Sequence, residues 1–261
     1  MGWFEAMILG IIQGLTEFLP ISSTGHLYLG RHMFGLDEAG LFLDTLLHFG
    51  TLLAVIIVFR EELLVVVKNP LGRLARLLFI GTIPTALIGL TFNDFFTNIS
   101  QTGETIGWEF LATGCILWIA DRWKETGYKE MEQISVRDAL IIGTFQGVAI
   151  LPAISRSGLT IAAALLRQIE KKSAASFSFL LSIPAITGAV VLQSRELADA
   201  STQFSLPLSS LLLATVTAAL CGYFAVKWMI RILCQGSLKG FAVYVWALGA
   251  IVLILQYSDN F

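Results

Sequence analysis

Six stretches of the chain are apolar over most of their length and carry few charged residues. Each is close to the ~20 residues that an α-helix needs to cross a membrane, although the third is shorter than the rest. This pattern predicts an all-α, polytopic membrane protein with six transmembrane helices. The predicted spans are residues 41–59, 74–92, 106–120, 175–193, 207–226 and 240–257.

Two further apolar stretches, residues 3–33 and 136–168, are interrupted near their middle by residues that break helices. Pro20 stands in the first break and Pro152 in the second, with glycines on both sides. Backbone that leaves the helix at membrane depth is tolerated only where it is buried in protein or lines a cavity. We therefore expect each stretch to form a re-entrant hairpin of two helices, which enters and leaves the membrane on the same side.

The two interrupted stretches carry the same polar motif, 133 residues apart. One copy runs from Gln13-Gly14 to Pro20-Ile21-Ser22-Ser23-Thr24-Gly25-His26, the other from Gln146-Gly147 to Pro152-Ala153-Ile154-Ser155-Arg156-Ser157-Gly158. Each half then holds one hairpin and three spans, so the second half is inverted relative to the first. The pattern predicts a single membrane domain, 1–261, of two inverted repeats (about 1–130 and 131–261) whose breaks meet near the midplane. Chance similarity of two breaks rich in Gly and Ser is the alternative.

The composition excludes an ordinary soluble globular protein. Mean hydropathy is +0.76, and charged residues make up 14% of the chain, against about 25% in soluble domains. Fourteen of the 17 basic residues fall on one side of the predicted membrane, Arg31 and Arg195 fall on the other, and Arg156 lies at membrane depth. Because loops rich in Lys and Arg face the cytoplasm, both termini are expected outside. The net charge of −2 itself says little about partners, and we expect no nucleic-acid partner.

Arg156 is the most informative polar residue of the second motif. An arginine in the middle of a membrane costs at least ~2.5–3.5 kcal/mol, so it normally serves a function. Its planar guanidinium suits a phosphate or a carboxylate. Small and hydroxyl side chains surround it at the start of a predicted helix, a typical anion site. They are Ser155, Ser157, Gly158 and Thr160. A structural salt bridge between Arg156 and Glu17 is the alternative.

The first motif supplies an acid and an amide. Gln13 and Glu17 are four residues apart, so on a helix they share a face. They could bind a divalent cation or position a hydroxyl group. A helix-capping role for Glu17 is the alternative.

Three hydroxyl residues, Ser22, Ser23 and Thr24, are candidate nucleophiles or substrate ligands, or they satisfy backbone groups freed by the break. His26 could act as a base, an acid or a nucleophile. Asp44 and His48, four residues apart on the first span, are interpreted as a supporting polar pair of structural value.

An anion site, an acid and a nearby His and Ser, facing a cavity open to lipid, indicate hydrolysis of a phosphoester or phosphoanhydride. The run Gln13-x-x-x-Glu17, the run 18–26 and the run Ser155-Arg156-Ser157-Gly158-Leu159-Thr160 resemble the signatures of a known family. This is the family of bacterial undecaprenyl-diphosphate phosphatases of the integral-membrane type, often called the bacitracin-resistance protein. The resemblance covers essentially the whole chain.

The resemblance implies a fold of interdigitated inverted repeats in the bacterial plasma (inner) membrane, with the site open to the periplasmic or extracellular side. It implies removal of the terminal phosphate of undecaprenyl diphosphate, which recycles the lipid carrier for cell-wall synthesis and gives bacitracin resistance. The implied cofactor is a divalent cation, Mg or Ca. The implied partners are the isoprenoid diphosphate and membrane lipids, and homodimer formation is left open.

By the same resemblance Glu17, His26 and Arg156 are essential, Ser23 is the nucleophile or a helper, and Ser155 and Thr160 contact the diphosphate. Whether Ser23 or His26 attacks is left open. The family's first acid is Gln13 here, which weakens a metal site of two carboxylates. The family's usual glycine after Pro152 is displaced, and Ala153 takes its place.

Two other functions compete with this interpretation. A flippase for prenyl phosphate would also need an anion site at the midplane, but it has no need of the Ser, His and Glu grouping. The acid-phosphatase-like lipid phosphatases need a second histidine further along the chain, and no histidine follows His48.

Overall fold

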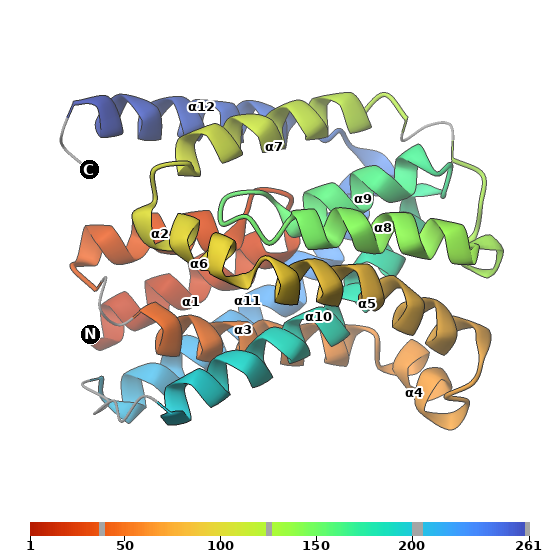
Figure 1. Ribbon diagram of the computed structural model, residues 1–261, viewed down its shortest axis with the longest axis horizontal. Helices are drawn as coiled ribbons and strands as arrows, with labels where there is room; N and C mark the ends of the chain where they lie inside the picture. The colour runs from red at the N-terminus through yellow and green to blue at the C-terminus, as the bar shows by residue number, and fades with distance from the viewer. Residues whose placement is uncertain (37–39, 124–126, 200–205, 259–261) are drawn as a thin grey trace.

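The structure is a computed structural model that describes residues 1–36, 40–123, 127–199 and 206–258. Within these ranges the regular structure is helical, apart from one isolated bridge between Lys129 and Ile169. Figure 1 shows long helices that run roughly along one direction and pack side by side. The predicted all-α class is confirmed.

Six of the helices coincide with the predicted spans. They are α3 (Gly40–Val58), α5 (Arg73–Thr91), α7 (Ile106–Ala120), α10 (Lys171–Asp199), α11 (Leu208–Gln235) and α12 (Lys239–Tyr257). Among the described residues, α5, α10, α11 and α12 are long and apolar enough to cross a membrane, and α3 with α4 (Arg60–Lys68) makes a fifth candidate, bent by 81°. The helix α7 is apolar but has only 15 residues. The multi-pass membrane class is therefore confirmed, and the number of six spans stays a prediction.

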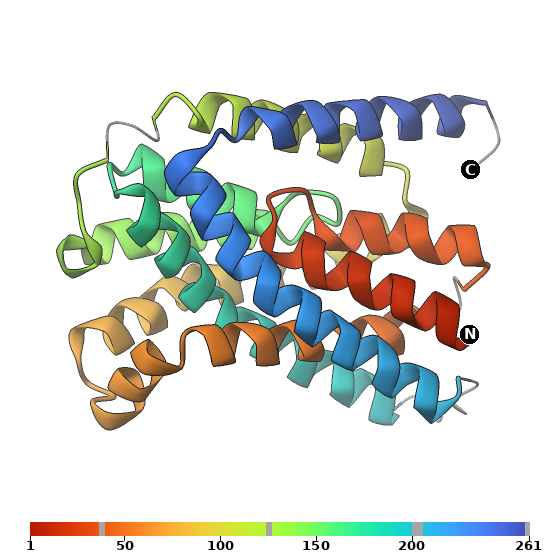
Figure 2. The same cartoon turned by 180° about the vertical axis from the view of Figure 1, so that it is seen from behind.

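Two pairs of helices form where re-entrant hairpins are predicted. The first pair is α1 (Trp3–Phe18) with α2 (Ser23–Phe34), and the second is α8 (Val136–Val148) with α9 (Arg156–Leu166). Figures 1 and 2 show the first pair at the end of the molecule that holds the N-terminus and the second pair at the opposite end, with their breaks together at the centre. A short 3-10 turn (Met131–Gln133) precedes α8.

Two short helices were not predicted. The first, α4, follows α3 after the bend, and the second, α6 (Asn93–Thr102), follows α5. None of the residues of α4 is buried. Both helices are too short and too polar to stand out as apolar segments, so hydropathy alone does not separate them from loops.

Glycines let each hairpin pack tightly against a long helix from the other half of the chain. In the first hairpin, a Cβ on Gly14 would lie 2.6 Å from the Ala218 carbonyl oxygen of α11. In the second hairpin, a Cβ on Gly143 would collide with the Gly81 carbonyl oxygen of α5. Small residues at such crossings are typical of helix packing in membranes, where close approach replaces the hydrophobic effect as the source of attraction. Each hairpin therefore packs against a long helix of the opposite half.

The N-terminal end of α8 is anchored by a buried carboxylate. The Asp138 side chain is fully buried and accepts hydrogen bonds from Ser135 Oγ (2.8 Å), Arg167 Nε (2.7 Å) and Lys129 Nζ (3.2 Å). Burial alone would raise the pKa of Asp138, but the hydrogen bonds from Ser135, Arg167 and Lys129 outweigh it and lower that pKa to about 2. This cluster ties the start of α8 to the end of α9 and holds the second hairpin closed.

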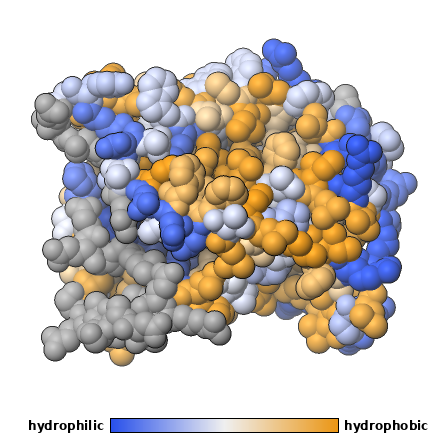
Figure 3. Space-filling model, in the orientation of Figure 1, coloured by the Kyte–Doolittle hydropathy of each residue, from blue (hydrophilic) through white to orange (hydrophobic). Residues whose placement is uncertain are grey.

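Apolar side chains cover much of the outside of the molecule. Figure 3 shows them gathered across the middle of one face, with hydrophilic residues toward both of its ends. Several that project from the candidate spans are more than half exposed: Leu87 and Leu90 of α5, Leu220 and Phe224 of α11, and Ile251 and Ile254 of α12. A surface of this kind is unfavourable in water, at about 25 cal/mol per Å², and is suited to contact with lipid chains. Membrane lipids are therefore partners of this protein.

Candidate functional site

Hydrogen bonds join the two breaks to each other. The Ser22 hydroxyl donates to the Pro152 carbonyl (2.9 Å), and the Ser157 hydroxyl donates to the Leu19 carbonyl (3.1 Å). Both contacts are buried. The two polar motifs, far apart in the sequence, therefore occupy one place in the fold.

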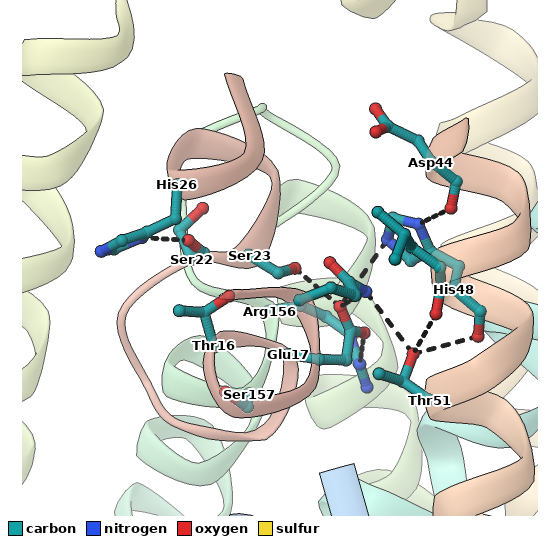
Figure 4. Close-up of polar contacts among 12 residues, drawn as sticks. Thr16, Glu17, Ser22, Ser23, His26, Asp44, His48, Thr51, Arg156 and Ser157 are labelled. Carbon is teal, nitrogen blue, oxygen red and sulfur yellow. Dashed lines mark hydrogen bonds and ion pairs between the residues drawn. The ribbon is translucent and has the colours of Figure 1, made fainter. Parts of the chain in front are cut away.

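Glu17 is the centre of this place. It lies in the last turn of α1 and is only 6% exposed. Its Oε1 atom accepts a hydrogen bond from Arg156 Nη2, and its Oε2 atom accepts from the Ser23 hydroxyl (2.6 Å) and from Gln13 Nε2 (3.0 Å) (Figure 4). A carboxylate at the C-terminal end of a helix is disfavoured by the helix dipole, and a buried one needs a counter-charge. The Arg156 guanidinium supplies that charge, and no helix-capping contact of Glu17 is found among the described residues.

One face of α3 completes the surroundings of Glu17. His48 Nε2 lies 3.6 Å from Glu17 Oε2, and Thr51 Oγ1 lies 3.5 Å from Gln13 Nε2. His48 Nδ1 contacts the backbone carbonyl of Asp44 (2.7 Å). Asp44 and His48 are therefore paired through the Asp44 backbone carbonyl and not through its carboxylate. The Nε2 side of the His48 ring faces Glu17. The spacing of residues 44, 48 and 51 on an otherwise apolar helix is the signal that could have assigned them to the site.

The Asp44 carboxylate forms an ion pair with Arg31 of α2, the helix that begins at Ser23. Both side chains are largely buried, at 15% and 12% exposure. This pair holds α2 against α3 on one side of Glu17 (Figure 4 shows Asp44 beside His48).

His26 points away from Glu17 (Figure 4). Its Nδ1 atom lies 2.6 Å from the Ser22 carbonyl oxygen, and its Nε2 atom lies 2.8 Å from the Tyr244 hydroxyl of α12. The structure therefore brings Ser23 and Glu17 together and leaves the His26 ring on the other side of α2. A role of His26 as acid, base or nucleophile stays a prediction. Nothing in the sequence around Tyr244 marks it as a partner of the first motif.

The residue before Ser23 has an unusual backbone conformation. Ser22 has a φ of 69°, in the left-handed region that favours glycine. A non-glycine residue there costs of order 1–3 kcal/mol, and such residues cluster at functional sites where the surroundings hold them. Because Ser22 is the N-cap of α2, its conformation sets the direction in which the helix and the Ser23 hydroxyl start.

The remaining residues of the second motif build the start of α9. The Ser155 hydroxyl caps the helix by accepting from the Gly158 backbone N–H (3.1 Å), and it lies 3.3 Å from the Ser157 hydroxyl. The Thr160 hydroxyl contacts the Ser178 hydroxyl of α10 (2.5 Å) and donates to its own helix. In this state Thr160 therefore faces α10, and a contact with the diphosphate stays a prediction. In the first motif, Thr24 is half-buried beside Ser23.

Two helices start at the site, α2 at Ser23 and α9 at Arg156. The first backbone N–H groups of a helix have no acceptor within it. Across the described residues, the N–H groups of Ser23, Thr24, Arg156 and Ser157 have no hydrogen-bond acceptor. Such groups, with the positive end of the helix dipole, form a ready site for phosphate. Arg156 adds a buried Nη1 atom that has no partner in the described part of the chain.

The residues present do not by themselves fit a resident divalent cation. Gln13 offers one buried and unpartnered oxygen, Oε1, and Glu17 offers one carboxylate whose charge is already matched by Arg156. Among the described residues no group of three His, Cys, Asp or Glu side chains could hold a metal ion. Calcium takes six to eight oxygen ligands, and magnesium is commonly held by one or two carboxylates together with phosphates of the substrate. Without phosphate oxygens from a substrate, these side chains offer too few oxygen ligands for a divalent cation.

Comparison with known proteins assigns the chain to a family over nearly its whole length. Residues 6–251 match the family model described as bacitracin resistance protein BacA. Undecaprenyl-diphosphatase 3 of Bacillus cereus is 59% identical over 261 residues, which is 100% of both chains. The undecaprenyl-diphosphatase of Carboxydothermus hydrogenoformans is 50% identical over 262 residues, again 100% of both chains. That of Halothermothrix orenii is 41% identical over 97% of both chains. This chain therefore belongs to the family of the bacitracin resistance protein BacA.

Proposed function

We propose that this protein hydrolyses undecaprenyl diphosphate to undecaprenyl phosphate and phosphate, the reaction after which its relatives are named. The observation that carries the proposal is the Ser23 hydroxyl, 2.6 Å from Glu17 Oε2, at a place where two helices start and the half-buried Arg156 lies. A nucleophile paired with a base beside an anion site is the arrangement that phosphoryl transfer requires. The pairing favours Ser23 over His26 as the attacking group.

In the proposed first step the Ser23 oxygen attacks the terminal phosphorus, and its proton passes to Glu17. The bond between that phosphorus and the bridging oxygen breaks, and undecaprenyl phosphate leaves. Water then attacks the phosphoserine, releases phosphate, and restores the Ser23 hydroxyl with the proton held on Glu17. Glu17 acts as the base in the first step, a role that typically contributes 10²–10⁴ in rate.

Arg156 and the helix N-termini would hold the diphosphate. The unpartnered Nη1 atom of Arg156 can donate to a phosphate oxygen while Nη2 stays on Glu17. The N–H groups at the starts of α2 and α9 add further donors, one set from each motif. Their fixed positions mean that little reorganisation is needed when negative charge develops on the transferring phosphoryl group. A flippase would use the same anion site, but the Ser23–Glu17 pair favours the enzyme. No step is assigned to a Mg or Ca ion, because the residues do not hold one on their own.

We also infer the finer topology. Six spans and two re-entrant hairpins, arranged as inverted repeats of about 1–130 and 131–261, account for the hairpins entering from opposite ends. The equivalent packing of Gly14 on α11 and Gly143 on α5 supports the same arrangement. The distribution of basic residues supports both termini outside. The family resemblance, and not this distribution, is what supports a site open to the periplasmic or extracellular side of a bacterial inner membrane. A homodimer stays a prediction. Lys124, one of the fourteen basic residues predicted on the cytoplasmic side, lies outside the described residues.

The test is phosphate release from undecaprenyl and farnesyl diphosphate by detergent-purified protein, with Mg, with Ca and with a chelator. We expect release by the wild type and a loss of at least about a hundredfold in Ser23→Ala and Arg156→Ala, because each removes a group on the reacting phosphate. Ser194→Ala, an exposed serine of α10, is the control. A folded wild type that releases no phosphate under any of these conditions would overturn the proposal, and transport of prenyl phosphate into liposomes would then be measured.

A further inference from the structure

The surroundings of His26 determine which ring nitrogen carries the hydrogen. Its Nδ1 atom lies 2.6 Å from the carbonyl oxygen of Ser22, and a carbonyl can only accept, so Nδ1 carries the hydrogen. In the neutral ring Nε2 is then an acceptor, and it lies 2.8 Å from the Tyr244 hydroxyl, which donates to it. Both nitrogens are occupied by groups outside the Ser23–Glu17 pair.

Aromatic rings hold the His26 side chain in this position. The Tyr244 ring is stacked on it, with centroids 5.7 Å apart and planes 12° apart, and the Phe110 ring meets it edge-on at 5.4 Å. The helix α2 lies so close to Phe110 that a Cβ on Gly25 would be 2.6 Å from the Phe110 ring. Rotation of the His26 ring toward Ser23 would have to break the hydrogen bond and separate the stacked rings.

His26 binds the backbone carbonyl of Ser22, the residue whose unusual conformation sets the direction of the Ser23 side chain. Ser22 has a φ of 69°, and its carbonyl oxygen accepts from His26 Nδ1. On its other side the Ser22 hydroxyl donates to the Pro152 carbonyl of the second break. A continuous series of hydrogen bonds thus runs from Tyr244 through His26 and Ser22 to Pro152. It fastens an unfavourable backbone conformation directly before Ser23.

We propose that His26 and Tyr244 are positioning residues, which brace the Ser22 bend so that the Ser23 hydroxyl faces Glu17. His26 does not transfer a proton in the reaction, and Tyr244 of α12 is a required partner that fixes the orientation of the His26 ring. Without the hydrogen bond from Nδ1, Ser22 relaxes toward a negative φ and turns the Ser23 hydroxyl away from Glu17. The functional consequence rests on the proposed hydrolysis at Ser23.

Substitutions of His26 separate a positioning role from acid–base chemistry. The side-chain nitrogen of asparagine can take the place of Nδ1 and donate to the Ser22 carbonyl, but it cannot exchange a proton. Glutamine places its nitrogen near Nε2, which leaves the carbonyl only the weaker hydrogen bond from the backbone N–H of residue 26 (3.4 Å). We expect His26→Asn to keep kcat for farnesyl diphosphate within about tenfold of wild type, and His26→Ala and His26→Gln to lose about a hundredfold, with KM changed less than kcat.

Tyr244→Phe removes only the hydroxyl, and we expect kcat to fall by about tenfold. His32→Asn, an exposed histidine on the same helix, is the control and should behave as wild type. Thermal unfolding of each purified variant shows whether it is folded. The proposal is overturned if folded His26→Asn is as impaired as His26→Ala, or if folded Tyr244→Phe has wild-type kcat.

A second measurement does not depend on the enzymatic activity. The chain has three histidines, so ¹⁵N-labelled histidine gives a spectrum in which the His26→Asn variant identifies the His26 signals. We expect hydrogen on Nδ1, and an Nε2 signal that shifts in Tyr244→Phe as its hydrogen bond is lost. Hydrogen on Nε2 instead would overturn the proposal even if the protein hydrolyses the substrate. The expected spectrum with no hydrolysis would overturn the proposed function and leave the brace intact.

Discussion

Substitution of Glu17 by glutamine tests the central contact of the site. The change keeps the size and shape of the side chain and removes its charge. The Ser23 hydroxyl could still donate to the new amide oxygen, but that amide cannot take up the Ser23 proton. Arg156 would lose its ion pair with Glu17 and become free to bind phosphate with both of its terminal nitrogens.

The two effects have opposite signs on catalysis and on binding. Loss of a general base typically lowers the rate by 10²–10⁴, or about 3–5 kcal/mol at 1.36 kcal/mol per factor of ten. We therefore expect kcat of Glu17→Gln to fall by this factor. A hydrogen bond to a charged group is worth about 1.5–3 kcal/mol, so the affinity for a prenyl bisphosphonate that cannot be hydrolysed should be unchanged or tighter, by up to about a hundredfold.

The assay is phosphate release for kcat and isothermal titration calorimetry for the bisphosphonate, both on detergent-purified protein that elutes as a single species. Glu61→Gln, an exposed carboxylate of α4, is the matched control and should change neither quantity. Retention of kcat within tenfold would refute the role of Glu17 as the base. Weaker binding of the bisphosphonate by a folded Glu17→Gln would refute the idea that the ion pair restrains Arg156.

Three other predictions concern packing, pH and metal. Gly143→Ala should lower the free energy of unfolding by the ~1–3 kcal/mol that overpacking typically costs, or more, and with it the melting temperature, because the new Cβ would collide with the Gly81 carbonyl. Gly188→Ala, where nothing lies within 4 Å of the added Cβ, should be close to neutral. Asp138→Asn should destabilise the protein at pH 7 by at least about 2 kcal/mol. Because the pKa of Asp138 in the folded protein is lowered to about 2, the difference in stability between wild type and variant should be present above about pH 4 and disappear as the pH falls toward 2. Thermal scans of both proteins across this pH range measure it. Mn²⁺ followed by electron paramagnetic resonance should bind weakly to the protein alone and tightly once a prenyl bisphosphonate is present, because the protein offers too few ligands; tight binding without it would contradict this.

The positions of the long helices follow from local sequence because a membrane allows few alternatives. Apolar segments must satisfy their own backbone hydrogen bonds there, so segments such as 74–92 and 240–257 coincide closely with α5 and α12. The breaks at Pro20 and Pro152 are local for the same reason. The helices α4 and α6 were not predicted because each is short and polar on one side, so neither stands out as an apolar segment.

The sequence alone predicted that the two motifs, with Glu17, Ser23 and Arg156, meet at one place, because polar groups at membrane depth need a partner or a function, and the structure brings these three side chains into contact. The sequence could not show the partners, since these come from helices that only packing brings together. His48 comes to Glu17 from α3, and Tyr244 comes to His26 across 218 residues. Local sequence determines which polar groups are buried, whereas the crossing of helices from two halves of the chain decides which atoms meet and which way each ring faces.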